Sequence, residues 1–282
     1  MIGQARLIQQ VDSIIEKELF PRFSIISGAG RCGKKMLAKH IAERLCAQLI
    51  LVDVKVDVIR EIIDLSYQQS EPTVYLIADA DKMSPGAKNA LLKITEEPPR
   101  KSYFIMTLQD TTSTLETLRS RGTILTMSPY SEDELMQYIE IKEGIAVDPK
   151  GAAEQRLIVS LSINPGDVDL LLRYDVYAFY QYAEKVVDSI GIVNGANAFK
   201  IGTKLAYKED DDGWDVKLFL RAVMQIFIKR MLLVGSITDK IRFGRSVQIT
   251  SKYLSELTIT GINKSATIDM WILELRSVWK EE

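Results

Sequence analysis

The chain has 282 residues, which suits two or three domains, and its 46% of hydrophobic residues are enough to form packed cores. Its formal net charge of −2 argues against strong, independent binding to duplex DNA, because such binding requires lysine and arginine to neutralise phosphates. No apolar run approaches the roughly 18–20 residues of a membrane-spanning helix, and two cysteines with one histidine exclude a four-cysteine zinc site.

Short apolar runs alternate with helical patterns in the first part of the chain. Such continuous apolarity is typical of strands in a parallel sheet that is covered on both faces. Between the runs, Leu37, Ile41 and Leu45 recur at helical spacing. The pattern predicts a doubly wound α/β domain over residues 1–128. Its predicted strands are residues 23–27, 49–52, 74–78, 103–107 and 123–125.

The strand signal stops after Pro129. Residues 131–134 read Ser-Glu-Asp-Glu, a capping box that begins a helix. A second helix is predicted after Asp148-Pro149, where proline takes the favourable first helical position, and a third over residues 167–173. Together they predict a small helical lid over residues 129–174.

The remaining residues, 175–282, show helical patterns throughout. Glycines such as Gly244, and the acidic stretch 209–213, predict breaks between the helices. We therefore expect an all-α C-terminal domain.

A phosphate-loop motif lies between the first predicted strand and a predicted helix. Gly28, Gly30 and Gly33 let the backbone wrap around phosphates, Lys34 supplies charge, and the helix N-terminus supplies N–H groups. The usual next residue is Ser or Thr, whose hydroxyl binds Mg²⁺, whereas here it is Lys35. An ammonium cannot ligate a metal. One interpretation is a structural relic, empty or holding an anion; the other is ATP or ADP bound without Mg²⁺, with Lys35 supplying part of the missing charge.

Five segments, in consistent order, resemble AAA+ clamp-loader subunits. Residues 78–84, Ala-Asp-Ala-Asp-Lys-Met-Ser, precede the run Asn-Ala-Leu-Leu-Lys-Ile-Thr-Glu-Glu-Pro-Pro over residues 89–99. Ile2-Gly3-Gln4 resembles the box that starts the family. Ser120-Arg121-Gly122 resembles its Ser-Arg-Cys motif, which implies that Arg121 reaches the ATP of a neighbouring subunit. Gly166-Asp167-Val168 stands where the family's second sensor helix begins.

The departures from the family pattern all affect the ATP site. Ala78 stands where active members carry the Asp that holds Mg²⁺, and Asp79 where they carry the Glu that positions water. With Lys35, both Mg²⁺ supports are lost, which should disable phosphoryl transfer. At the position of the family's first sensor residue, which follows the fourth predicted strand, Thr107 is the plausible polar group. At the second, Asp169 replaces the Arg that would contact the γ-phosphate.

The chain is most similar to the delta-prime branch of the family, whose ATP site is nonfunctional. Many bacterial members insert a four-cysteine zinc module after the first helix, but here the chain runs from Cys46 straight into the second predicted strand. Residues 175–282 resemble the family's helical collar in position and length alone.

The resemblance implies a non-catalytic subunit that scaffolds a replication clamp-loading ring and supplies Arg121 to a neighbouring ATPase subunit. Its partners would be an ATPase subunit and a clamp-opening subunit directly, and the sliding clamp and primer-template DNA indirectly. The alternative is an active ATPase that uses Lys34 and Asp79. A free-standing DNA-binding AAA+ protein is disfavoured by the net charge and by the lack of a recognisable helix-turn-helix. Since the N-terminus has no signal-like stretch, we expect a cytoplasmic protein.

Overall fold

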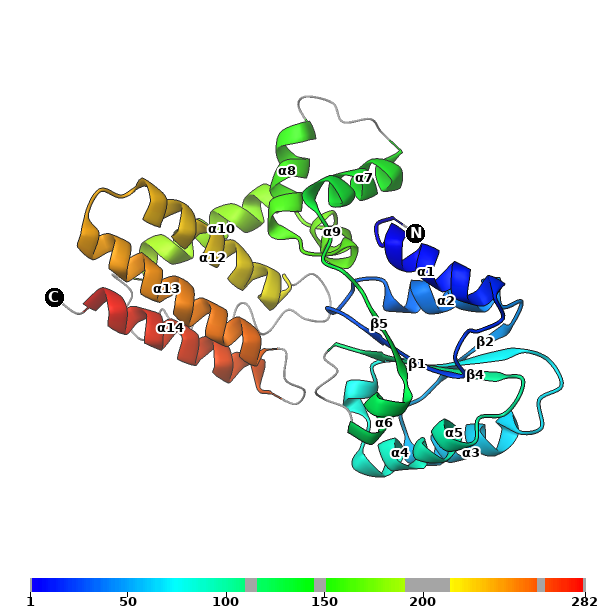
Figure 1. Cartoon of the computed structure of the whole chain (residues 1–282). Coiled ribbons are helices and arrows are strands. Elements are labelled where there is room, and N and C mark those ends of the chain that lie inside the picture. The colour runs from blue at the N-terminus through cyan, green and yellow to red at the C-terminus, as the bar shows by residue number, and fades with distance from the viewer. Residues whose placement is uncertain (1, 110–115, 145–150, 191–213, 258–261, 281–282) are drawn as a thin grey trace. The chain divides into compact units, whose positions relative to one another are not determined.

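The chain forms two compact units in a computed structural model (Figure 1). The structure describes residues 2–109, 116–144, 151–190, 214–257 and 262–280. One unit combines Met1–Glu143 with Ile163–Gly166, and the other combines Gly144–Ser162 with Asp167–Glu282. The predicted domain boundaries at residues 128/129 and 174/175 stay a prediction.

The first unit is built on a five-stranded, fully parallel sheet of order β2-β3-β4-β1-β5. All five predicted strands are confirmed to within one residue at each end. The central strands are the most buried, so the prediction of a sheet covered on both faces holds. The strands are β1 (Phe23–Ser27), β2 (Gln48–Val52), β3 (Thr73–Ile77), β4 (Ser102–Leu108) and β5 (Thr123–Thr126).

Two hydrophobic clusters fix the helices to opposite faces of this sheet. One face is covered by α1 (Ala5–Glu16) and α2 (Lys34–Arg44), and Figure 1 shows a second group of helices on the other. These are α3 (Val56–Ser66), the 3₁₀ turn η1 (Ala80–Lys82), α4 (Pro85–Ala90), α5 (Leu92–Glu96) and α6 (Glu116–Arg121). Residues 85–96 form two short helices, α4 and α5, which meet at Leu91.

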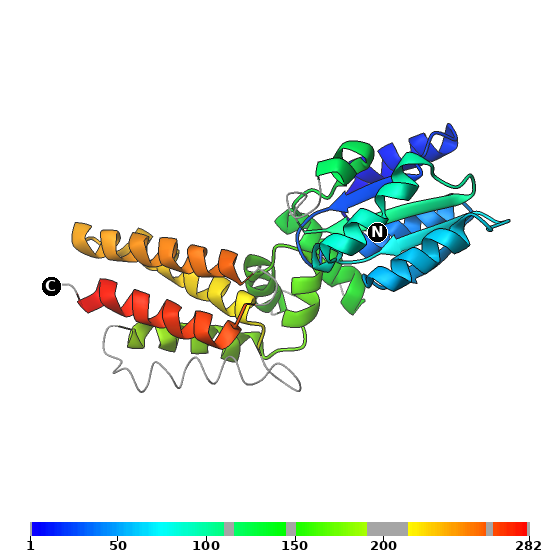
Figure 2. The same cartoon turned by 90° about the horizontal axis from the view of Figure 1, so that it is seen from below.

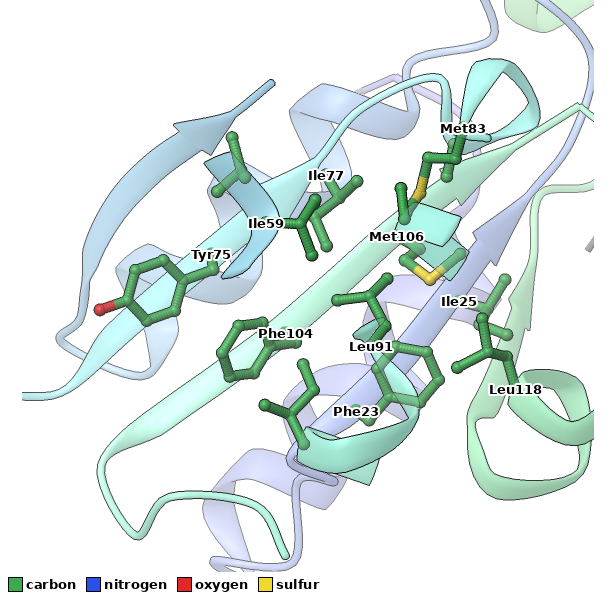
Figure 3. Close-up of a cluster of buried hydrophobic side chains, with 14 of the residues drawn as sticks. Phe23, Ile25, Ile59, Tyr75, Ile77, Met83, Leu91, Phe104, Met106 and Leu118 are labelled. Atoms are coloured by element: carbon green, nitrogen blue, oxygen red, sulfur yellow. The ribbon is translucent and has the colours of Figure 1, made fainter. Parts of the chain in front are cut away.

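The cluster under α6 determines where that helix lies. Leu118 is fully buried and lies beside Phe23 and Ile25 of β1 (Figure 3). Next to α6, a side chain at Gly122 would place its Cβ 2.8 Å from the ring of Phe23, so this position requires glycine. Both contacts anchor α6 against the strand that starts the phosphate loop.

The predicted capping box is confirmed at the start of α7 (Glu132–Glu143). The Ser131 N–H donates to Glu134 Oε2 at 2.9 Å, and the Glu134 N–H donates to Ser131 Oγ at 3.2 Å. These reciprocal bonds satisfy two of the N–H groups that a helix start leaves unpaired.

All the secondary structure described in the second unit is helical, as predicted. α13 packs against both α12 and α14 (Figure 2), and Trp271 of α14 is fully buried. The predicted third lid helix is present, starting two residues early at Pro165. The predicted break at Gly244 is wrong, because that glycine lies inside α13. The residues around Asp148-Pro149 and the acidic stretch 209–213 lie outside the described residues. The helices are α8 (Gly151–Leu161), α9 (Pro165–Leu171), α10 (Val176–Ser189), α12 (Val216–Leu233), α13 (Ile237–Glu256) and α14 (Lys264–Lys280).

Among the residues that the structure describes, no helix has the length and apolarity needed to cross a membrane.

Candidate functional site

The phosphate loop joins β1 to α2 and keeps the backbone geometry that its glycines predict. Gly33 precedes α2 with a φ of 94°, a left-handed conformation that favours glycine. At Gly28 a Cβ would lie 2.8 Å from Met127 Cβ, so the strand end and the β5 end approach too closely for any side chain. Gly30 lies between these two glycines in the sequence, and a Cβ there would be 3.8 Å from the Gln109 Oε1 atom.

The two lysines at the start of α2 have different environments. Lys34 is buried, with 7% of its surface exposed, and its Nζ donates to the carbonyl oxygens of Gly28 and Ala29, both at 2.7 Å. The loop's own backbone thus binds the ammonium. Lys35 is exposed.

A distant segment of the same unit covers the loop. Asn164, 2% exposed, donates from Nδ2 to the Gly30 carbonyl at 3.0 Å. A Cβ at Gly166 would lie only 2.4 Å from Arg31 Cβ, so this glycine packs directly on the loop. The sequence motif Asn-Pro-Gly predicts a chain break here, but nothing in it indicates the contact with the phosphate loop.

The second phosphate-site motif follows β3. Ala78 offers no metal ligand, and the Asp79 carboxylate lies 3.8 Å from Lys82 Nζ. Asp79 has a φ of 53°, and its N–H donates to Thr107 Oγ1 at 3.0 Å, so the hydroxyl of the candidate first sensor accepts a hydrogen bond from the second phosphate-site motif. In the described part of the chain, no group of three or more His, Cys, Asp or Glu residues could hold a metal ion. At the two positions where the family resemblance places the Mg²⁺ supports, the Lys35 ammonium and the Ala78 methyl group offer no oxygen ligand.

The N-terminal box is joined to the segment after β5. The side-chain amide of Gln4 donates to the Ser128 carbonyl at 2.7 Å and accepts from the Ser128 N–H at 2.8 Å. Two residues on, the Tyr130 hydroxyl donates to the Cys32 carbonyl of the phosphate loop at 2.9 Å. Burial is the main cause that raises the pKa of Tyr130 to about 12. These bonds fix one side of the loop.

Arg121 lies at the end of α6, next to the edge strand β5. Its side chain is 39% exposed; Nη1 donates to the Thr117 carbonyl at 3.0 Å and Nη2 to Glu96 Oε1 at 3.2 Å. Glu116, the other carboxylate close in sequence, lies 4.0 Å from Arg119. Glu96 lies 25 positions from Arg121 in the sequence, and the fold brings the two side chains together.

The second-sensor helix, α9, carries two acidic residues with different surroundings. Asp169 is half-buried. Asp167 is buried and forms an ion pair with Arg221 of α12, with 2.5 Å between Oδ2 and Nη1. Both residues of that pair belong to the second unit. The sequence gives no signal for Arg221, because its partner is 54 positions away.

Comparisons with known proteins agree with these motifs. The family model described as "DNA polymerase III, delta subunit" matches residues 48–131. The chain is 34% identical over 127 residues to DNA polymerase III subunit gamma of Buchnera aphidicola subsp. Acyrthosiphon pisum (strain APS), covering 42% of this chain and 35% of that protein. It is 42% identical over 69 residues to subunit delta' of Yersinia pestis, covering 23% of this chain and 20% of that protein. The chain thus spans about a third or less of the length of these relatives.

Solved structures share the fold. A DNA polymerase III, gamma subunit-related protein from Thermotoga maritima has a TM-score of 0.51 at 15% identity, covering 97% of this chain and 100% of that one. The RuvB Holliday junction branch migration motor of the same organism has a TM-score of 0.51 at 18% identity, covering 80% and 78%. The predicted fold class is confirmed: an AAA+ core with an all-α C-terminal region.

The family-model match runs from β2 to the segment after β5, so it includes the second phosphate-site motif, the 89–99 run and Arg121. Over this part of its length the chain is thus similar to AAA+ clamp-loader subunits of DNA polymerase III, near the delta-prime branch.

Proposed function

We propose that this chain is a non-catalytic clamp-loader subunit that acts in DNA replication. Its AAA+ core would dock beside an ATPase subunit, and Arg121 would complete the ATP site of that neighbour. Residues 175–282 would act as the collar that holds the ring together. In this role its partners are an ATPase subunit and a clamp-opening subunit in the cytoplasm, with the sliding clamp and primer-template DNA contacted through the assembly.

The observation that carries the proposal is the contrast between Arg121 and the chain's own ATP site. Arg121 is an exposed guanidinium beside the edge strand of the sheet, where a neighbouring subunit can reach it. A planar, permanently charged guanidinium can stabilise negative charge on a transferring phosphoryl group. The chain's own site instead has Lys35 and Ala78 at the two positions that hold Mg²⁺ in active members.

The phosphate loop is proposed to be a relic that binds at most an anion or a nucleotide without Mg²⁺. Its Lys34 ammonium is held by two carbonyl groups of the loop, and any phosphate would have to displace those contacts. The N–H groups at the start of α2 would be the donors for such an anion.

The alternative, an active ATPase using Lys34 and Asp79, is tested by the turnover of the purified chain. We expect phosphate release at background, with or without Mg²⁺. A turnover on the order of 1 s⁻¹, in the ordinary enzyme range, that requires Mg²⁺ and is abolished by Lys34→Ala would contradict the non-catalytic proposal. The Lys35→Ala variant is the matched control, since it removes a neighbouring ammonium that is exposed.

A further inference from the structure

The guanidinium of Arg121 is held from two different helices. Thr117, one turn earlier in α6, accepts a hydrogen bond from Nη1 at 3.0 Å. Glu96, the last residue of α5, accepts one from Nη2 at 3.2 Å. The Thr117 contact lies within α6. The Glu96 contact comes from a different helix, α5, so it is the one that restrains the guanidinium relative to the surroundings of α6.

These two contacts leave most of the guanidinium's hydrogen-bonding capacity unused by Thr117 and Glu96. A guanidinium carries five N–H donors, and each of the two contacts uses one. The side chain is also 39% exposed. Arg121 therefore has a preferred direction and donors that can still reach an incoming anion.

We propose that Glu96 is a positioning residue, which holds Arg121 in one orientation before a neighbouring subunit docks. This inference rests on the proposed function, in which Arg121 acts on the phosphate of a neighbour. A long arginine side chain without such a partner samples many rotamers, and ordering it at the moment of docking is unfavourable. A carboxylate that orders it in advance reduces that cost, as supporting residues do around preorganised sites.

The negative charge of Glu96 does not prevent this role. Its side chain is 59% exposed, so water screens its attraction to Arg121 and the pair is weak. The guanidinium keeps its charge, and a phosphate, which carries more negative charge than one carboxylate, can compete for it.

The chain supplies matched controls for the charge of Glu96. Glu97 is the next residue and is exposed, but no ion pair with Arg121 is found for it within the described residues. Glu116 is in α6 itself and lies beside Arg119 instead. Neutralising either one changes the net charge equally without removing the contact to Arg121.

The test is a reconstituted ring of this chain with its ATPase partner, in which kcat and KM for ATP are measured. We expect Glu96→Ala to lower kcat by roughly 5- to 10-fold with little change in KM, since misplacing a group that acts in the transition state reduces the chemical step. Glu96→Gln keeps an oxygen acceptor and should recover most of the rate. Glu97→Gln and Glu116→Gln should match the wild type. In an Arg121→Ala background, Glu96→Ala should cause no further loss.

The outcomes separate this inference from the proposed function. Should Glu96→Ala leave kcat unchanged or raise it while Arg121→Ala lowers it, the positioning role is wrong and the proposed function stands. A Glu96→Ala loss that persists in the Arg121→Ala background also overturns the positioning role. If Arg121→Ala itself has no effect, the proposed function fails, and this inference with it.

Discussion

Two cations of the same unit, Lys34 and Arg121, are used in opposite ways. Lys34 is buried and bonded to two carbonyl groups of its own loop. Arg121 is exposed, and among the described residues it is held by the Thr117 carbonyl and by the exposed carboxylate of Glu96. Burial without a partner is costly for an ammonium, so the contacts of Lys34 first serve the fold. An exposed guanidinium has no such need. On the proposed function, the comparison separates a phosphate loop that now serves the fold from a surface group that acts on a partner.

The largest effect should come from removing the exposed cation. Arg121→Ala should lower the turnover of the ATP site that it completes by about 10³-fold, the lower end of the range for arginines supplied in trans. The chain's own stability should change little, because an exposed ion pair contributes at most about 1 kcal/mol. Steady-state ATPase of the reconstituted ring and urea unfolding of the isolated chain measure the two quantities.

Arg121→Lys is the control for charge alone. An ammonium lacks the planar fork of donors, so this variant should recover little of the lost turnover. A partner rate that Arg121→Ala leaves unaltered, together with a clear loss of stability, would instead assign Arg121 to its own fold.

For Lys34, the buried cation, we expect the substitution to change the stability of the isolated chain more than a substitution of Arg121 does. Lys34→Met keeps the apolar stem but removes the donor to two carbonyls, and we expect a loss of about 2 kcal/mol in the free energy of unfolding. Lys35→Met, one position on and exposed, should stay within about 0.5 kcal/mol of the wild type. Urea unfolding of the isolated chain measures both. Equal stabilities for the two variants would show that the carbonyl contacts of Lys34 do not support the fold.

The sequence predicts the parts of this comparison that depend on local pattern. Continuous apolar runs predict the strands, and the residue types at Lys35 and Ala78 predict the lost Mg²⁺ supports. The sequence does not predict the long-range contacts around the phosphate loop and Arg121. Asn164 reaches the loop across 134 positions and Glu96 reaches Arg121 across 25. Such pairs arise only when the sheet brings separate segments together, so no spacing rule indicates them.

Gly244 shows the opposite error, in which a local rule is overridden. Glycine lowers helix stability by about 1 kcal/mol, and a break is the natural prediction. In α13 the long helix continues through it, with Phe243 and Ser246 buried on either side. Tertiary packing of the long helix compensates for one unfavourable residue.

The smallest expected effect concerns Tyr130, which connects the segment after β5 to the phosphate loop. Its hydroxyl donates to the Cys32 carbonyl, and burial raises the pKa of Tyr130 to about 12, above the value near 10 of an exposed tyrosine. A group whose pKa is raised in the folded state stabilises the protein below its unfolded pKa and loses that contribution as the pH rises through the folded pKa. Tyr130→Phe should therefore cost about 1 kcal/mol at neutral pH, the value of one hydrogen bond. The wild type should lose this advantage between pH 10 and 12.

Tyr177→Phe, at a tyrosine that is 45% exposed, is the control. Urea unfolding at pH 7, 10 and 11.5 measures the difference between wild type and variant, which cancels the titration of the other tyrosines. A difference that stays constant across this range would mean that the Tyr130 hydroxyl is exposed to water and does not hold the loop.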